Sequence, residues 1–138
     1  MKVFWDTNLF IYLFEEYGAL TEAVLALEER MRARSATLVT SAFTIGEILV
    51  RPMSLGLDDI VAQYDAAIRQ QAMVVPFDGA AVHAFARIRA SGVGPPDSIQ
   101  LACAAAAGAN LFVTNDDRLS RRIIPGVPII TSLANVPI

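Results

Sequence analysis

Short apolar runs alternate along the chain with longer stretches in which apolar residues recur at helical spacing. The short runs are rich in β-branched and aromatic residues and are bounded by polar residues or turn formers, which is typical of buried strands. The predicted strands cover residues 3–5, 37–40, 73–77, 111–113 and 129–130. The predicted helices cover residues 8–16, 21–34, 42–50, 57–68, 80–90 and 99–109. Strands that alternate with helices in this way predict a parallel α/β sheet with helices on both faces.

Several polar, proline and glycine residues predict where the helices begin and end. Thr21 is the expected cap of the second helix, Pro52 is expected to end the third, and Gly108 is expected to stop the sixth. The loop at residues 91–96 is the clearest break in the chain, but it is too short for a domain linker. We therefore expect one domain over residues 1–138.

Composition narrows the class of protein. With 54% hydrophobic and 18% charged residues, the chain is not disordered. No apolar run reaches the roughly 18 residues that a membrane span needs, so we expect a soluble, cytoplasmic protein without a signal peptide. Cys103 is the only cysteine, which excludes an internal disulfide and leaves no cysteine partner for a zinc site.

The net charge of the chain argues against nucleic-acid binding through a general basic surface. A net charge of -3 gives no general basic field of the kind that attracts nucleic acids, so any nucleic-acid role must come from a local site. Ten of the eleven basic residues are arginine, and Lys2 is the only lysine.

Four carboxylates stand in apolar surroundings rather than on amphipathic surfaces. Asp6 and Asp116 each follow a predicted strand, Asp97 follows the loop at residues 91–96, and Glu47 lies on a predicted helix. Because ligands of parallel α/β sheets bind at the carboxyl ends of the strands, we expect the first three to meet at one edge, with Glu47 reaching them from its helix.

Such a cluster favours a hard divalent cation. Two carboxylates about 4 Å apart repel by roughly 4 kcal/mol at an effective dielectric of 20, so four of them need a counter-charge or protons. Oxygen ligands suit Mg²⁺ or Mn²⁺, and the absence of nearby histidine and cysteine argues against zinc. Beside a phosphodiester, such a site could activate a water and stabilise the leaving oxygen.

Each acid also has a purely structural interpretation, which is compatible with the functional one because a cap at a sheet edge faces the ligand crevice. These interpretations are an Asx-type turn at Asp6, a capping box of Thr44 with Glu47, a capping box of Asp97 with Gln100, and a helix start at Asp116 and Asp117. The set of four, rather than any one member, favours a functional site.

Other candidates carry less weight. His83 is the only histidine and has no serine or acid motif nearby, so a surface or half-buried position on its helix is expected rather than general base catalysis. Trp5 is most simply a core residue. The basic segment after Asp116 could contact RNA phosphates or could be a solvated face. Its members are Arg118, Arg121 and Arg122.

Together these motifs resemble the PIN domain, and more narrowly a VapC-type toxin ribonuclease of a toxin-antitoxin pair. The likeness covers the whole chain in order, and the four-part set is more specific than any one part. The motifs are Asp6-Thr7-Asn8 after an apolar strand, Ser41 followed by Glu47 in Ser-Ala-Phe-Thr-Ile-Gly-Glu-Ile-Leu, Asp97 in Asp-Ser-Ile-Gln-Leu-Ala-Cys, and Leu-Phe-Val-Thr-Asn-Asp ending at Asp116.

The resemblance implies a PIN-like three-layer α/β/α fold with a parallel, about five-stranded sheet. It also implies Mg²⁺- or Mn²⁺-dependent cleavage of RNA, a homodimer, and inhibition by a small cognate antitoxin of the VapB kind. The matching catalytic and metal-binding acids are Asp6, Glu47, Asp97 and Asp116, and the matching polar residues around them are Thr7, Asn8, Ser41 and Thr114. Leu119 stands where many relatives carry a further acid, and Asp117 beside Asp116 is a second candidate for the last position.

Alternative functions remain open. A catalytically inert or housekeeping PIN module that binds RNA or protein would keep the fold without the toxin role. A phosphoacceptor signalling domain would need a late lysine, but the sole lysine is Lys2. A haloacid-dehalogenase-like phosphatase would need Asp-x-Asp where this chain has Asp6-Thr7-Asn8, and a dinucleotide-binding protein would need a glycine-rich first turn.

Overall fold

A five-stranded, all-parallel sheet forms the centre of the computed structural model, which describes residues 1–138. The strand order is β3-β2-β1-β4-β5, so β1 is central and pairs with β2 on one side and β4 on the other. The strands are β1 (Lys2–Trp5), β2 (Thr37–Ser41), β3 (Met73–Val75), β4 (Leu111–Thr114) and β5 (Ile129–Ser132). The predicted α/β fold and all five predicted strands are confirmed.

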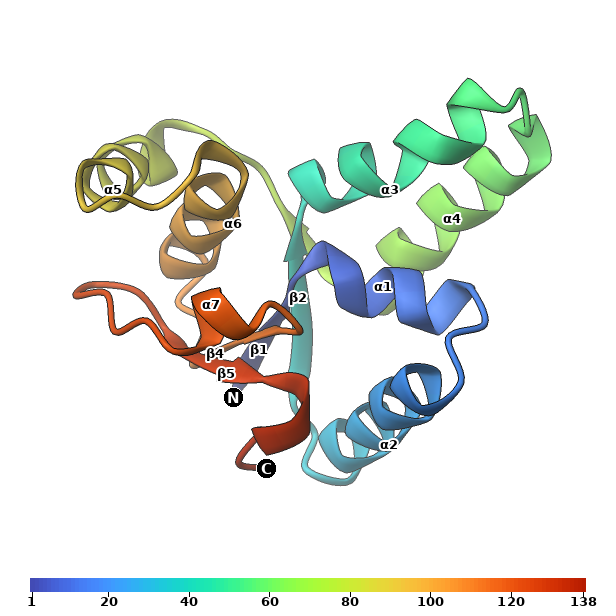
Figure 1. Ribbon diagram of the computed structural model, residues 1–138, viewed down its shortest axis with the longest axis horizontal. Coiled ribbons are helices and arrows are strands. Elements are labelled where there is room, and N and C mark those ends of the chain that lie inside the picture. Colours follow the sequence, from blue (N-terminus) through green and yellow to red (C-terminus); the bar gives the residue numbers. More distant parts are fainter.

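Helices cover both faces of this sheet and make three layers (Figure 1). One face carries α1 (Thr7–Phe14), α2 (Ala19–Ala33), α3 (Ala42–Ser54) and α4 (Asp58–Gln71). The other carries α5 (Gly79–Ala90), α6 (Pro95–Ala106) and the short α7 (Asp117–Ser120) after β4. The 3-10 turn (Leu133–Asn135) after β5 contacts α2, and its Leu133 joins the core on the first face.

Alternating side chains of the strands build one core on each face. Val3 and Trp5 of β1 join the core under α1 to α4, whereas Phe4 between them joins the core under α5 and α6 and stacks on Phe112 of β4. Since β1 is buried on both faces, it reads as a continuous apolar run up to Asp6.

Three predicted helix boundaries are wrong, each for a local reason. Helix α2 begins at Ala19, because Thr21 is not a cap: its hydroxyl donates to the Tyr12 carbonyl at 2.6 Å and ties down the preceding loop. Helix α3 continues through the buried Pro52 to Ser54, since a proline near a helix end removes a single backbone hydrogen bond. Helix α6 begins at Pro95 rather than at residue 99, because prolines are tolerated in a first helical turn, whereas Gly108, with a φ of +68°, stops the helix as predicted.

Two further features bear on function. No helix combines the length and apolar character that crossing a membrane would require. Lys2 lies at the start of β1, and its ammonium group donates to the Ala107 carbonyl at 2.9 Å beyond the end of α6. The sole lysine therefore stands at the edge of the sheet opposite to Asp6.

Candidate active site

Three segments that follow parallel strands turn into helices at the same edge of the sheet. Asp6 caps α1 directly after β1, Ser41 caps α3 at the end of β2, and Asp116 caps α7 after β4. Each cap side chain accepts a backbone N–H of its helix, which satisfies donors that have no partner within the helix. The helix start predicted at Asp116 is confirmed, and this edge collects three helix N-termini.

Asp6 is the most buried of the four acids, with 8% of its surface exposed. Its carboxylate accepts the Thr7 backbone N–H at 2.8 Å and the Thr114 hydroxyl at 2.7 Å. Burial, helped by the charges of Asp97 and Glu47, nevertheless raises the pKa of Asp6 from 3.8 to about 6, against the two hydrogen bonds. The site therefore disfavours a bare negative charge at its centre.

The charges of Glu47 and Asp97 act on Asp6, and the charge of Asp116 acts on Asp97. Partial burial raises the pKa of Glu47, on α3, and the Asp97 charge adds to the effect. Partial burial likewise raises the pKa of Asp97, on α6, and here the added charge is that of Asp116. The four acids predicted from the sequence thus form one interacting set: Asp6, Glu47, Asp97 and Asp116.

No cationic side chain of the chain neutralises these acids. The two ion pairs of the structure, Arg32 with Glu29 and Arg69 with Asp65, are both on exposed helix surfaces elsewhere. The donor set is made of oxygen atoms alone, which fits Mg²⁺ or Mn²⁺ and not zinc. No three acids, histidines or cysteines stand close enough to hold an ion among them. Mg²⁺ commonly binds only one or two carboxylates directly and keeps several waters, so acids that stand further apart can still bind it.

Asn8 and Thr114 connect the Asp6 region to the segment after β4. The Thr114 hydroxyl oxygen accepts two hydrogen bonds, one from the Asn8 side-chain amide at 3.3 Å and one from the Asp116 backbone N–H at 3.1 Å. With both neighbours donating to it, the hydroxyl has its own hydrogen free for Asp6. These contacts orient the Asp6 carboxylate, as predicted for polar residues around the acids.

Thr7 and Ser41 belong to a second polar group, which the sequence analysis did not identify. Thr7 donates to the Glu47 carboxylate at 2.5 Å, and the amide nitrogen of Gln100 donates to Thr7 at 3.1 Å. The same nitrogen donates to Thr44 at 2.7 Å, and Ser41 donates to the Gln100 side-chain oxygen.

Both predicted capping boxes are therefore wrong. Helix α6 is capped by Gly94, so Asp97 lies within its first turn and Gln100 faces the interior, where 1% of its surface is exposed. Thr44 lies inside α3 and contacts Gln100 rather than capping a helix with Glu47. A glutamine in an otherwise apolar helical segment is the signal that could have revealed this group.

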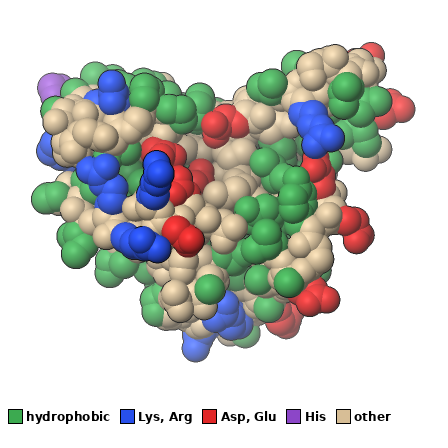
Figure 2. Space-filling view, viewed as in Figure 1, with side chains coloured by type: hydrophobic (Ala, Val, Ile, Leu, Met, Phe, Trp, Pro, Cys, Tyr) green, Lys and Arg blue, Asp and Glu red, His purple; other side chains and the backbone are tan.

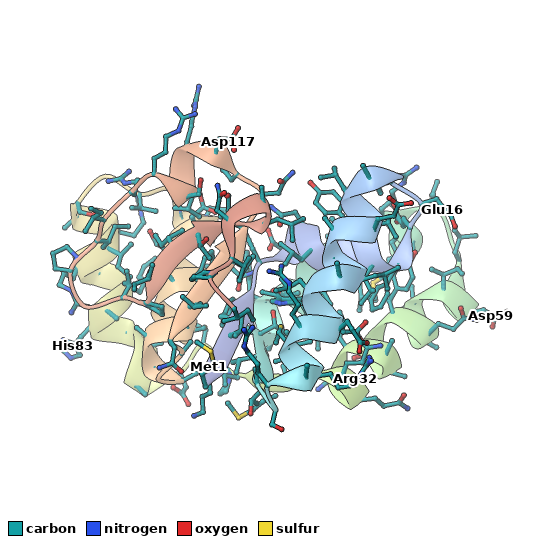
Figure 3. All side chains as sticks on the ribbon, turned by 90° about the horizontal axis from the view of Figure 1, so that it is seen from below. Met1, Glu16, Arg32, Asp59, His83 and Asp117 are labelled. Carbon is teal, nitrogen blue, oxygen red and sulfur yellow. The ribbon has the colours of Figure 1, made fainter.

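Some candidate residues lie outside the acidic set. Asp117 is exposed at the outer edge of α7 (Figure 3), and its side chain accepts no hydrogen bond. His83 is exposed at the periphery (Figure 3), as predicted. Figure 2 shows basic side chains gathered beside acidic ones on the left half of one face. The arginines after Asp116 are exposed and form no ion pair: Arg118, Arg121 and Arg122.

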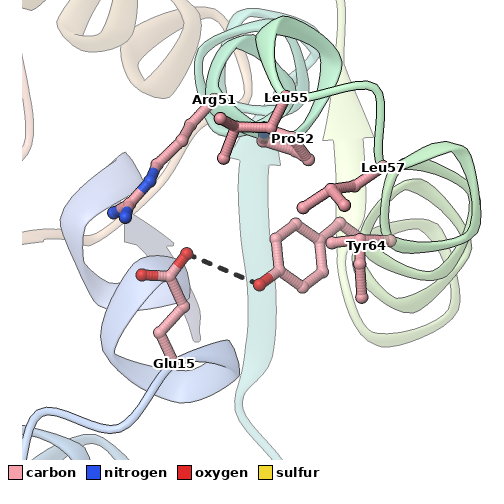
Figure 4. Close-up of a pocket in the computed structure, with 7 residues that line it drawn as sticks. Glu15, Arg51, Pro52, Leu55, Leu57 and Tyr64 are labelled. Atoms are coloured by element: carbon pink, nitrogen blue, oxygen red, sulfur yellow. Dashed lines mark hydrogen bonds between the residues drawn. The ribbon is translucent and has the colours of Figure 1, made fainter.

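A groove lies between α1, α3 and α4, and Figure 4 shows its lining. It encloses about 290 Å³, and the Tyr64 hydroxyl contacts the Glu15 carboxylate across it at 3.5 Å. A smaller cavity of about 120 Å³ shares Glu15 and Arg51 with the groove and is lined at its other side by Glu47. The groove itself contains none of the four acids, but it leads toward one of them.

Comparisons with known proteins identify the family and the fold. The family model described as the PIN domain matches residues 3–123. The curated protein sequences contain no match. Solved structures with the same fold include VapBC2 from Rickettsia felis bound to a DNA fragment from its promoter, with a TM-score of 0.76 and 16% identity over 96% of this chain and 98% of that one.

Two other solved structures are similar. DNA-bound VapBC from Salmonella typhimurium has a TM-score of 0.71 and 25% identity, over 96% of this chain and 98% of that one. VapBC-5 from Mycobacterium tuberculosis, a member of the VapBC family of toxin-antitoxin systems, has a TM-score of 0.56 and 21% identity, over 95% and 96%.

Proposed function

This chain belongs to the PIN domain family, and from that premise we propose that it is a metal-dependent endoribonuclease that acts as the toxin of a type II toxin-antitoxin pair. The observation that carries the nuclease activity is the set of four acids at the carboxyl edge of the sheet. Three of them have a raised pKa, and none has a cationic partner. An acidic site of this kind is suited to a divalent cation and a phosphodiester.

The residues of the site have distinct roles in this proposal. Mg²⁺ or Mn²⁺ would be held by Asp6, Glu47, Asp97 and Asp116, either directly or through its waters, and when bound it supplies positive charge to the phosphate and lowers the pKa of a coordinated water. Thr114 keeps the Asp6 carboxylate in one orientation by its hydrogen bond at 2.7 Å. Thr7 does the same for Glu47 at 2.5 Å. A site held in this way needs little rearrangement when substrate arrives.

RNA phosphates need cations outside the acidic set, because the four acids repel the substrate. Arg118 lies in α7, two residues after the Asp116 cap, and its guanidinium is exposed and forms no ion pair. We assign phosphate contacts to Arg118, Arg121 and Arg122. The scissile phosphate would then lie between these arginines and the acids.

The proposed partner is a small antitoxin of the VapB kind. It is supported by the similarity to the VapBC complexes and by an apolar surface at the α3–α4 turn. There Val50, Met53, Leu55 and Leu57 are 45–66% exposed and adjoin the groove of Figure 4. Since that groove leads toward Glu47, a peptide in it could also cover the acids. Leu55→Glu should abolish co-purification with the antitoxin encoded beside this chain while leaving RNA cleavage intact.

A homodimer is also proposed, on the family resemblance. The apolar run of α1 is used largely inside the chain: Leu9 and Phe10 are fully buried, and Phe14 stacks on Tyr64. Sedimentation at micromolar concentration checks the dimer, and a monomer there would contradict it.

The alternatives have less support. A phosphoacceptor domain needs a lysine beside its acids, whereas Lys2 is bonded to the Ala107 carbonyl at the opposite edge of the sheet. An inert PIN module has no need for four mutually repelling acids, two of which, Asp6 and Glu47, are held by hydroxyl groups.

The deciding experiment is cleavage of mixed RNA with Mg²⁺ or Mn²⁺ by the native protein and by Asp6→Ala and Asp97→Asn. We expect both variants to lose at least about 100-fold in rate, because each removes a proposed metal ligand. Asp59→Asn, an exposed carboxylate on α4, is the control and should retain full activity. Equal rates in all the proteins, or no cleavage by the native protein, would refute the proposed function.

A further inference from the structure

We propose that Gln100 is a positioning residue, which fixes the direction of the Thr7 hydroxyl and thereby holds the Glu47 carboxylate in the site. Gln100 lies on α6, whereas Thr7 and Glu47 lie on α1 and α3. The side chain thus joins the two helical layers across the carboxyl edge of the sheet. Its consequence for catalysis rests on the proposed function, but the hydrogen-bond arrangement does not.

The donors and acceptors of this polar group can be assigned completely. The Gln100 amide has two hydrogens, and they go to the Thr7 oxygen at 3.1 Å and the Thr44 oxygen at 2.7 Å. The Gln100 side-chain oxygen accepts the Ser41 hydroxyl. Gln100 therefore uses every group that its amide offers, although it is buried.

The remaining hydroxyl hydrogens then have one preferred direction each, since the Thr7 hydroxyl also lies 3.3 Å from the Thr44 oxygen but is closer to the Glu47 carboxylate. Thr7, which receives a hydrogen from Gln100, turns its own toward Glu47 at 2.5 Å. Thr44 lies 2.9 Å from Thr40, and Thr40 lies 3.0 Å from the Trp5 carbonyl. Thr40 has a single hydrogen and the Trp5 carbonyl can only accept, so Thr40 donates to Trp5 and the hydrogen between Thr40 and Thr44 is that of Thr44.

The opposite orientation of the Gln100 amide is disfavoured. It would aim the amide oxygen at Thr7 and Thr44 and draw their hydrogens away from Glu47. The Thr7 and Glu47 oxygens would then stand 2.5 Å apart without a hydrogen between them, and an ionised carboxylate cannot supply one. Because Glu47 is otherwise held by no hydrogen bond, its position depends on the Thr7 hydrogen.

The test is direct observation of Glu47 in the metal-free protein by carboxyl ¹³C NMR. The measurement is made at about pH 8, well above the ordinary pKa of a glutamate, and Glu47→Gln assigns the signal. We expect Gln100→Met and Thr7→Val to shift the Glu47 signal in the same direction. In the double variant the two shifts should not add, because both act through one hydrogen bond. Gln70→Met, the same substitution on an exposed position of α4, should leave the signal unchanged.

Cleavage assays give the second readout. Gln100→Met should lower kcat by about 10- to 100-fold, as expected for loss of a residue that orients a ligand. Ile88→Val, a buried substitution on α5, should lose comparable stability without this loss of rate. If Gln100→Met does not fold, Gln100→Glu keeps the shape but can only accept hydrogens, and it should shift the Glu47 signal as well.

The outcomes distinguish the positioning role of Gln100 from the proposed nuclease function. An unchanged Glu47 signal in the folded Gln100 variants overturns the positioning role, even if the native protein cleaves RNA. Additive shifts in the double variant would also overturn the positioning role, as would equal losses of rate in Gln100→Met and Ile88→Val. A native protein that cleaves no RNA refutes the nuclease function, while the NMR shifts still decide the role of Gln100.

Discussion

Replacing Asp6 by asparagine should make the metal-free protein more stable relative to the native chain as the pH rises. Burial raises the pKa of Asp6 from 3.8 to about 6, so the folded state binds the proton more tightly than the unfolded chain does. The stabilisation by protonation is complete below about pH 4 and is lost as the pH rises through about 6. At about 1.4 kcal/mol per pKa unit, ionised Asp6 costs the native protein about 3 kcal/mol in all.

Asparagine removes that charge and also disturbs the hydrogen bonds. Its amide can accept the Thr7 backbone N–H, but its NH₂ group would face the Thr114 hydroxyl, which already receives two donors. This loss of about 1 kcal/mol is the same at every pH, so the informative quantity is the pH dependence. Between pH 5 and pH 8, the stability of Asp6→Asn relative to the native protein should rise by about 1.4 kcal/mol.

The assay is urea denaturation of both proteins at these two pH values in the presence of a chelator. Asp59→Asn makes the same change at an exposed position of α4 and should show no comparable rise. A stability difference between Asp6→Asn and the native protein that is the same at pH 5 and pH 8 would refute the claim that desolvation dominates at Asp6.

Three further predictions concern the metal, the RNA surface and the thiol. Adding Mn²⁺ should raise the urea midpoint of the native protein more at pH 8 than at pH 5, because protons and the cation compete for the same oxygens; an equal rise would contradict the acidic site. Replacing Arg118, Arg121 and Arg122 by alanine should weaken RNA binding and reduce the salt slope of the binding constant by up to about two, whereas an unchanged slope would exclude them from the interface. Burial raises the pKa of Cys103 to about 11, so a thiol reagent should modify it only on unfolding, and rapid reaction of the native protein would contradict its burial.

The strands and the four acids could be predicted from the sequence because both depend on local order along the chain. A run such as Val3-Phe4-Trp5 is apolar because β1 is covered on both faces, and its abrupt end at Asp6 marks the edge of the sheet. Asp116 was predicted in the same way, because it follows the apolar run that forms β4. Parallel strands all end at one edge, so strand ends far apart in sequence were expected to meet.

The helix boundaries were less predictable, since a cap is decided by what else a side chain can reach. Thr21 has the residue type of a cap, yet its hydroxyl donates to the Tyr12 carbonyl. Asp97 and Gln100 have capping-box spacing, yet the helix begins at Pro95, which puts Gln100 on the inner face. One turn of difference in the start of a helix changes which side chains face the core.

The sequence by itself determined the α/β class, the order of the strands along the chain and the acids that end or adjoin them, because hydrophobic spacing and strand termini are local properties. Only the tertiary structure decided that Gln100 of α6 meets Thr7 of α1 and Thr44 of α3, more than 50 residues away in each case. It also decided that burial raises the pKa of Asp6 to about 6. Hydrogen-bond partners and desolvation depend on which helices the sheet brings together, and no spacing within one segment contains that information.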